Sequence, residues 1–184
     1  MSASPSQAIL LVDGYNVIGA WPELIKLRDG QGLDIARTSL AETLANYSAY
    51  RGFETLLVFD AYGQRQAHRI EKFTQHLSIH FTSFGQTADS YIEISCAKFR
   101  NDIRKFEKRL IVATSDRAQR LTVVGYGAEW MSAAQLNADV NLSVQKVKYR
   151  QKPKRQSKQR FLSKSLNPEM QAKLAKLRSN LMED

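Results

Sequence analysis

The chain has 184 residues, enough for one α/β domain with an additional segment, and its 43% apolar content supports a packed core, which excludes wholesale disorder. One cysteine, Cys96, leaves no intrachain disulfide partner, and together with three histidines it shows no zinc-ligand spacing. The net charge of +9 lies at one end: residues 1–145 hold 15 basic and 15 acidic side chains, and residues 146–184 hold 12 basic and three acidic ones. The apolar run at residues 9–12 is too short for a signal peptide or a membrane span, so we expect a cytoplasmic protein with no membrane partner.

Apolar strands alternate with amphipathic helices along the first 150 residues. Strands are predicted at residues 8–13, 54–60, 77–83 and 109–116, and the first, second and fourth of these segments end in an aspartate. Helices are predicted to begin near residues 34, 87, 117 and 132. Residues 14–32 are predicted to form a loop, and residues 61–76 show no pattern that predicts a helix or a strand. This alternation predicts an α/β fold with a mainly parallel sheet and helices on both faces.

Two of the predicted helices have long apolar stripes. The first stripe predicts a helix from Thr87 to Phe106 and consists of Ile92, Cys96, Phe99, Ile103 and Phe106. The second begins with a capping box at Ser132–Gln135 and consists of Leu136, Val140, Val144 and Val147. Cys96 is therefore expected to be a buried core thiol, whereas the three histidines, His68, His76 and His80, are expected on the surface or in loops.

The composition changes near Lys146, where "KVKYRQKPKRQSKQR" begins. We predict one domain at residues 8–150 and a basic tail at 151–184, with a short amphipathic helix starting at Asn167–Pro168. A run of positive charge without acidic residues suits the phosphate backbone of a nucleic acid, and a solvated tail that aids solubility is the alternative. The candidate nucleic-acid contacts are Lys146, Lys148, Arg150, Lys152, Lys154, Arg155, Lys158 and Arg160.

Three predicted strands end in an aspartate, and a fourth aspartate opens a helix. These residues are Asp13, Asp60, Asp116 and Asp89. The carboxyl ends of parallel strands meet at one edge of the sheet, which is where such folds bind ligands. Several carboxylates there repel one another unless a cation compensates, and Mg²⁺ or Mn²⁺ suits oxygen ligands. Such a metal can activate water against a phosphodiester.

Three of the four aspartates also have a structural explanation. Asp13 before Gly14 can be a turn residue, Asp89 can favour the positive end of its helix, and Asp116 can cap the following helix. Asp60, directly after a buried strand, has no such explanation. The coincidence of all four favours a shared site.

Four polar residues near these aspartates are candidate companions. Asn16 can orient a ligand or form an Asx-turn. Glu93 lies one turn after Asp89 and can support the metal ligands or simply be solvated. Thr114 and Ser115 can hydrogen-bond a phosphate or a metal-bound water, or cap a helix.

The segments "ILLVDGYNVIGAWPEL", "LLVFDAY", "TADSYIE" and "VATSD", in this order and spacing, resemble the YacP-like branch of the NYN domains, relatives of the PIN-domain ribonucleases. The resemblance spans about residues 8 to 150. It implies a PIN-like three-layer α/β/α sandwich and a metal-dependent endoribonuclease with Asp13, Asp60, Asp89 and Asp116 as acidic site and Asn16 as polar companion. RNA turnover in this branch implies mRNA as substrate and, in some members, the ribosome as partner. A non-catalytic RNA- or ribosome-binding module and a DNA-directed nuclease are the alternatives.

Overall fold

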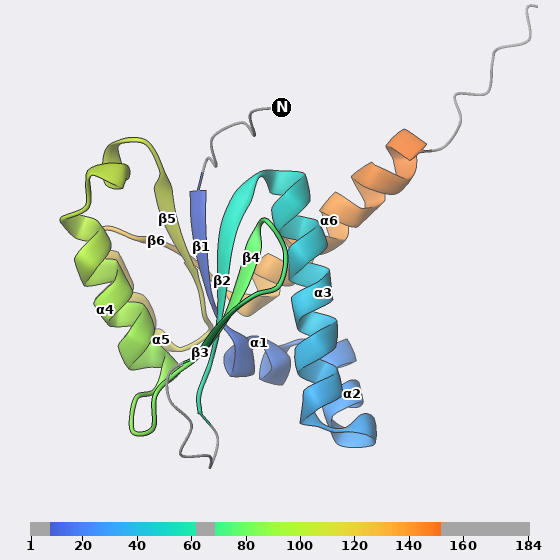
Figure 1. Ribbon diagram of the computed structural model, residues 1–184. Coiled ribbons are helices and arrows are strands. Elements are labelled where there is room, and N and C mark those ends of the chain that lie inside the picture. The colour runs from blue at the N-terminus through green and yellow to red at the C-terminus, as the bar shows by residue number, and fades with distance from the viewer. Residues whose placement is uncertain (1–7, 62–68, 152–184) are drawn as a thin grey trace, which may run out of the picture. The chain divides into compact units, whose positions relative to one another are not determined.

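The computed structural model describes residues 8–61 and 69–151 (Figure 1). Residues 1–145 belong to one compact unit and residues 146–184 to a second. The described part of the first unit contains a sheet with the strand order β3-β4-β2-β1-β5-β6. The parallel strands are β1 (Ala8–Asp13), β2 (Phe53–Phe59), β4 (Leu77–Phe81), β5 (Arg109–Ala113) and β6 (Glu129–Met131). The edge strand β3 (Arg69–Lys72) pairs antiparallel with β4. The chain therefore has the mainly parallel sheet that its sequence predicts.

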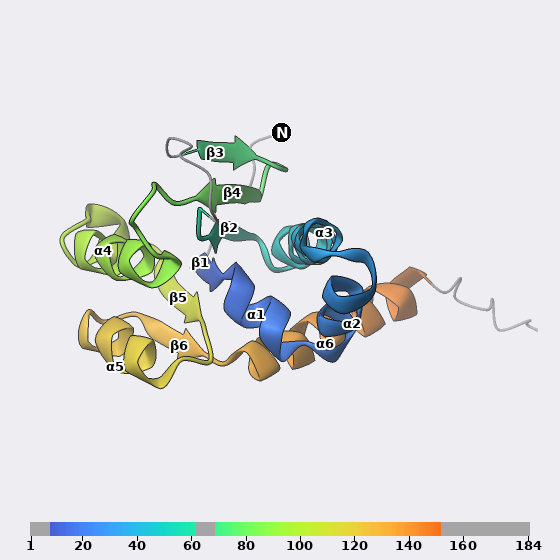
Figure 2. The same ribbon diagram turned by 90° about the horizontal axis from the view of Figure 1, so that it is seen from below.

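Helices cover both faces of this sheet, as the view along the strands shows (Figure 2). One face carries α1 (Gly14–Ala20), α2 (Pro22–Gln31), α3 (Leu33–Arg51) and the first turns of α6 (Ala133–Gln151). The other carries α4 (Ala88–Arg100) and α5 (Arg117–Gly125). A short 3-10 helix, η1 (Ile103–Phe106), connects α4 to β5. The three-layer α/β/α arrangement implied by the family resemblance is confirmed.

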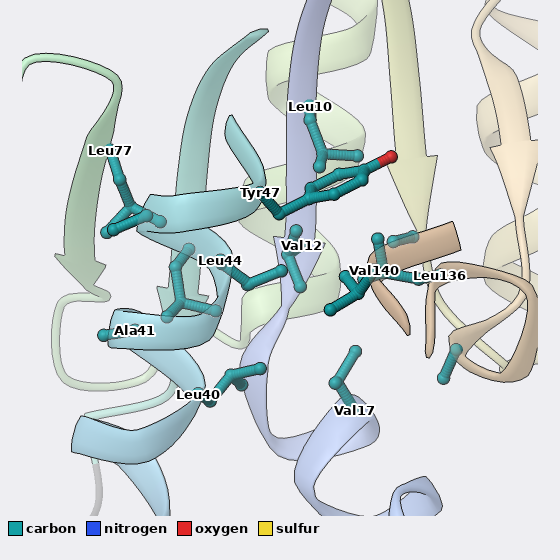
Figure 3. Close-up of a cluster of buried hydrophobic side chains, with 14 of the residues drawn as sticks. Leu10, Val12, Val17, Leu40, Ala41, Leu44, Tyr47, Leu77, Leu136 and Val140 are labelled. Atoms are coloured by element: carbon teal, nitrogen blue, oxygen red, sulfur yellow. The ribbon is translucent and has the colours of Figure 1, made fainter. Parts of the chain in front are cut away.

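Two apolar cores follow from the alternation of side chains along the strands. Leu10 and Val12 of β1 face α1, α3 and α6, and Figure 3 shows Leu10 beside Tyr47 and Val12 beside Leu44 of α3. Residues 9 and 11 of the same strand face α4 and α5 on the other side of the sheet. Asp13 continues this second row at the end of the strand, so its side chain belongs on the α4 side of the sheet.

The predicted loop at residues 14–32 is wrong, because the structure has two helices there. The Asp13 side chain accepts a hydrogen bond from the Asn16 N–H at 3.1 Å and so caps α1. Trp21 interrupts the helices in an extended conformation, and Pro22 then occupies the first position of α2, where its missing N–H costs nothing. The Trp21 indole is buried and donates to the Ala133 carbonyl at 2.8 Å. Tertiary burial outweighs the turn-like composition of this segment.

Both apolar stripes are shorter than their spacing suggests. α4 ends at Arg100, and Ile103 and Phe106 are 80% and 81% exposed, because the chain turns there to enter β5. In α6 the inward position after Val140 is Ser143, while Val144 is exposed. The capping box is confirmed, since the Ser132 and Gln135 side chains accept each other's backbone N–H at 3.1 and 2.8 Å.

The prediction for one histidine is wrong, and several predictions for the basic segment concern residues that the structure does not describe. His80 is not a surface residue, because it is fully buried on β4 and its ring stacks on Tyr91 at a centroid distance of 3.9 Å. α6 continues to Gln151 and so includes Lys146, Lys148 and Arg150. The remaining basic candidates, Lys152, Lys154, Arg155, Lys158 and Arg160, and the helix predicted at Asn167 lie outside the described residues. Within residues 8–61 and 69–151, no helix has the length and apolarity needed to cross a membrane.

Candidate active site

The four aspartates predicted from the strand ends lie at the carboxyl edge of the sheet. Asp13 ends β1, and Asp60 follows β2, its neighbour in the sheet. Asp116 follows β5 on the other side of β1, and Asp89 lies in the first turn of α4. The negative charges of Asp89 and Asp60 raise the pKa of Asp13. Those of Asp116 and Asp60 raise the pKa of Asp89. The structure therefore brings all four carboxylates into one electrostatically coupled group.

Asp13 is the most buried member of this group, with 8% of its surface exposed. Burial, followed by the charges of Asp89 and Asp60, raises the pKa of Asp13 to about 6 against the opposing effect of the Asn16 N–H. The Asp13 carboxyl also lies within hydrogen-bonding reach of Asp89. A group in this position is ionised at neutral pH only at a cost to the fold, and a bound cation would remove that cost.

Asp89 is half-buried, and its pKa is also raised, first by burial and next by the charge of Asp116. The N-terminus of α4 is already capped by other groups. The Thr87 hydroxyl accepts the Ser90 N–H at 3.2 Å, and the Asp60 carboxylate accepts the Ala88 N–H in a short hydrogen bond. Thr87 and Asp60 supply the capping hydrogen bonds, so Asp89 contributes only its first-turn charge to this terminus, and α4 holds Asp60 in place.

Asp116 caps α5, as one of the sequence explanations anticipated. Its Oδ1 accepts the N–H groups of Ala118 and Gln119 at 2.7 and 3.1 Å. Both bonds use the same oxygen, and the residue is exposed to solvent. The capping role therefore orients the carboxylate and occupies one of its two oxygens.

Asn16 connects two loops of the site that are far apart in the sequence. Its side-chain oxygen accepts the Ser115 N–H at 2.7 Å, which ties α1 to the loop after β5. In that loop the Thr114 hydroxyl is buried and accepts the Asp116 N–H at 3.1 Å, and the Ser115 hydroxyl accepts the Ala133 N–H at 3.2 Å. Asn16, Thr114 and Ser115 thus hold the backbone around Asp116. A contact of these side chains with a phosphate or a metal-bound water stays a prediction.

Glu93 lies one turn after Asp89 on α4 and is half-buried. Its negative charge is among the smaller causes that raise the pKa of Asp89. On the inner side of α4, burial and then Glu93 raise the pKa of Cys96 to about 12, which confirms the expected core thiol. Glu93 therefore adds to the negative potential of the edge.

Gly14 is a residue of this site that the sequence reasoning missed. A Cβ at this position would lie 2.2 Å from Cε1 of Phe59, a distance that no real contact allows. The Phe59 ring is buried between Tyr15, at a centroid distance of 5.0 Å, and Phe81, at 5.8 Å. Only glycine lets α1 begin this close to β2, and the "DG" pair was the available signal.

The donor atoms at this edge are all oxygen, the type that Mg²⁺ and Mn²⁺ prefer. In the described residues, no three acidic, histidine or cysteine side chains are already arranged to share one ion. Asp13 lies within hydrogen-bonding reach of Asp89, and Asp60 and Asp116 follow the strands on either side of β1. Mg²⁺ is commonly held by one or two carboxylates and several waters, so this donor set fits a hydrated ion.

Comparison with known proteins identifies the family. The model of the YacP-like NYN domain matches residues 10–179. The chain belongs to the YacP-like NYN domain family. The match extends past residue 150 into the basic segment. NYN domains are a nuclease-type family whose members generally resemble ribonucleases. This chain therefore belongs to a nuclease-type family.

Relatives of this NYN protein are known from Bacillus subtilis. The protein YacP of strain 168 is 35% identical over 143 residues, which are 77% of this chain and 80% of the relative. The crystal structure of Rae1 (YacP) is 29% identical with a TM-score of 0.62 and covers 96% of this chain and 91% of its own. The crystal structure of a mutant form of Rae1 is 33% identical with a TM-score of 0.64, at 78% and 81% coverage. Both structures share the fold described above.

Proposed function

We propose that this NYN protein is a metal-dependent endoribonuclease that cleaves RNA phosphodiesters at the acidic edge. The observation that carries the proposal is the convergence of Asp13, Asp60, Asp89 and Asp116, in which burial and mutual repulsion raise the pKa of Asp13 and Asp89. Membership of a nuclease-type family supports the same reading. Helix capping accounts for Asp13, Asp60 and Asp116 one at a time. It does not account for four carboxylates at one edge of the sheet, whose repulsion a bound cation would compensate.

Asp13 and Asp89 would hold Mg²⁺ or Mn²⁺ between them, with Asp60 and Asp116 contributing from either side. When bound, such an ion supplies the positive charge that favours ionisation of an attacking water and stabilises the leaving oxygen of a phosphodiester. The chain's own contribution is to keep the carboxylates in position. The N-terminus of α4 fixes Asp60 through the Ala88 N–H, and the caps of α1 and α5 fix Asp13 and Asp116.

RNA is the proposed substrate, mRNA in particular, and the ribosome is a proposed partner through the family resemblance. The acidic edge repels a polyanion in the absence of metal, so a separate positive element would have to offset that repulsion. We propose the basic residues from Lys146 to Arg160 as that element. In the described part of this run, Lys146 and Lys148 are exposed on α6 and available to phosphates.

The test is cleavage by the purified full chain of a single-stranded RNA, a DNA of the same sequence, and an mRNA on ribosomes. Each reaction is run with Mg²⁺, with Mn²⁺ and with excess EDTA. We expect RNA cleavage only with metal, and no cleavage by an Asp13→Asn variant. Asp29→Asn is the matched control, because Asp29 is an exposed aspartate of α2 paired with Arg28. RNA binding without cleavage under every condition would favour the non-catalytic module instead.

A further inference from the structure

A cleft of about 440 Å³ lies beside the acidic edge. The first half of α3 forms one wall, and β3, β4 and the end of β2 form the other. Asp60 and Ala61 line it, so the cleft opens directly beside one of the four carboxylates. Its volume is at the lower end of the range for sites that hold a small ligand, which suits a single nucleotide better than a longer stretch.

Aromatic and aliphatic side chains form part of the lining of the cleft, and some of them remain accessible. Phe59 and Phe81 are stacked with their planes 25° apart, and Phe81 is only half-buried. Phe73, just after β3, is 42% exposed and lines the same cleft, together with Ile79. An exposed phenylalanine beside a polar edge contributes little to the core, and it offers a flat surface on which a base can stack.

Two arginines from different elements stand in the walls of the cleft. Arg37 of α3 lies 5.9 Å from the ring centroid of Phe81 and donates a hydrogen bond to the Tyr15 hydroxyl at 3.1 Å. Arg69 of β3 has a side chain that is 63% exposed. Each also pairs with an acidic neighbour, Asp34 or Glu71. A guanidinium has five N–H donors, so one carboxylate leaves donors for a phosphate.

We infer that this cleft binds one nucleotide of single-stranded RNA next to the scissile phosphate. Its base stacks against Phe73 and Phe81, and its phosphate contacts Arg37 or Arg69. The position relative to the scissile bond rests on the proposed function, whereas binding in the cleft does not. A base paired in a duplex is buried in its own stack and cannot enter such a site, so the cleft selects single strands over duplexes.

Photo-crosslinking of the full chain in EDTA tests the inference, because the RNA stays intact there. A short oligonucleotide carries 4-thiouridine at one position at a time, and the crosslinked peptides are mapped. We expect crosslinks to the segments of Phe73 and Phe81 from one or two adjacent positions only. Crosslinks confined to other segments, or no RNA binding at all, would overturn the inference.

Variants provide the second measurement, the dissociation constant for the same oligonucleotide. Phe73→Ala should weaken binding by about 5- to 100-fold, as loss of one stacked base does. Phe106→Ala is the control, an exposed phenylalanine at the opposite edge of the sheet. Arg69→Gln should also weaken binding, and Arg109→Gln, which breaks a similar exposed Arg–Glu pair, should not.

The outcomes separate this inference from the proposed function. Weaker binding by Phe73→Ala and Arg69→Gln, in a protein that never cleaves RNA, would support the cleft and reject the nuclease. Metal-dependent cleavage that both variants retain at the level of their controls, with unchanged dissociation constants, would reject the cleft and keep the nuclease.

Discussion

Replacement of Asp13 by asparagine should stabilise the metal-free protein while it removes a carboxylate from the candidate site. Burial and the charges of Asp89 and Asp60 raise the pKa of Asp13 from 3.8 to about 6. The folded state therefore binds this proton more tightly than the unfolded chain does. A tenfold difference in proton affinity is worth about 1.4 kcal/mol, so the ionised side chain destabilises the fold by roughly 3 kcal/mol. Asparagine keeps the volume and the capping oxygen for α1.

The assay is urea unfolding in EDTA between pH 4 and pH 8, for the wild type and for Asp13→Asn. The stability that protonated Asp13 provides is complete below its unfolded pKa of 3.8 and is lost as the pH rises to about 6. The advantage of the variant should therefore grow from near zero at pH 4 to roughly 3 kcal/mol above pH 7. Asp29→Asn should show no such trend. A variant that is less stable than the wild type at pH 7, or a difference independent of pH, would show that the ionised Asp13 side chain does not destabilise the fold.

Three further predictions concern the site, the packing and the basic segment. Asp60→Asn should abolish cleavage, whereas Glu93→Gln should reduce it about 10- to 100-fold in single-turnover assays, and equal losses would show that Glu93 is a ligand. Gly14→Ala should cost about 1–3 kcal/mol in urea unfolding because its methyl group meets a buried ring, and Gly19→Ala, which meets nothing within 4 Å, should not. Residues 1–152, checked for folding by circular dichroism, should bind RNA more weakly than the full chain and with a smaller salt dependence; equal salt slopes would leave the tail a role in solubility only.

The convergence of the aspartates was predictable because it depends on topology alone. Once β1, β2 and β5 are assigned as parallel strands, their carboxyl ends must lie at one edge of the sheet. The contact between Asn16 and Ser115 was not predictable, because it joins residues 99 positions apart and depends on how two loops pack. For the same reason, sequence spacing could not show that both Thr114 and Ser115 would support the backbone.

The errors in the fold arise where tertiary contacts outweigh local preference. Gly14 and Pro22 resemble turn residues, but the first is required by the approach to Phe59 and the second starts a helix. The strands β3 and β6 have only four and three residues, too few for a periodic signal, and pairing with a neighbour decides them. The cleft could not be predicted for a related reason, because Phe73 lies in residues 61–76, which have no pattern that predicts a helix or a strand.

Mapping of RNA ends across a transcriptome is the most direct test of the central claim that this acidic edge cuts RNA. The same host cells would carry the wild-type protein, the Asp13→Asn variant, the Asp29→Asn control or no copy. We expect a set of new RNA ends that the wild type and the control produce in common, and that the purified protein reproduces with Mg²⁺ or Mn²⁺. Those ends should be absent with Asp13→Asn. The same ends at the same abundance with Asp13→Asn would contradict RNA cleavage at this acidic edge.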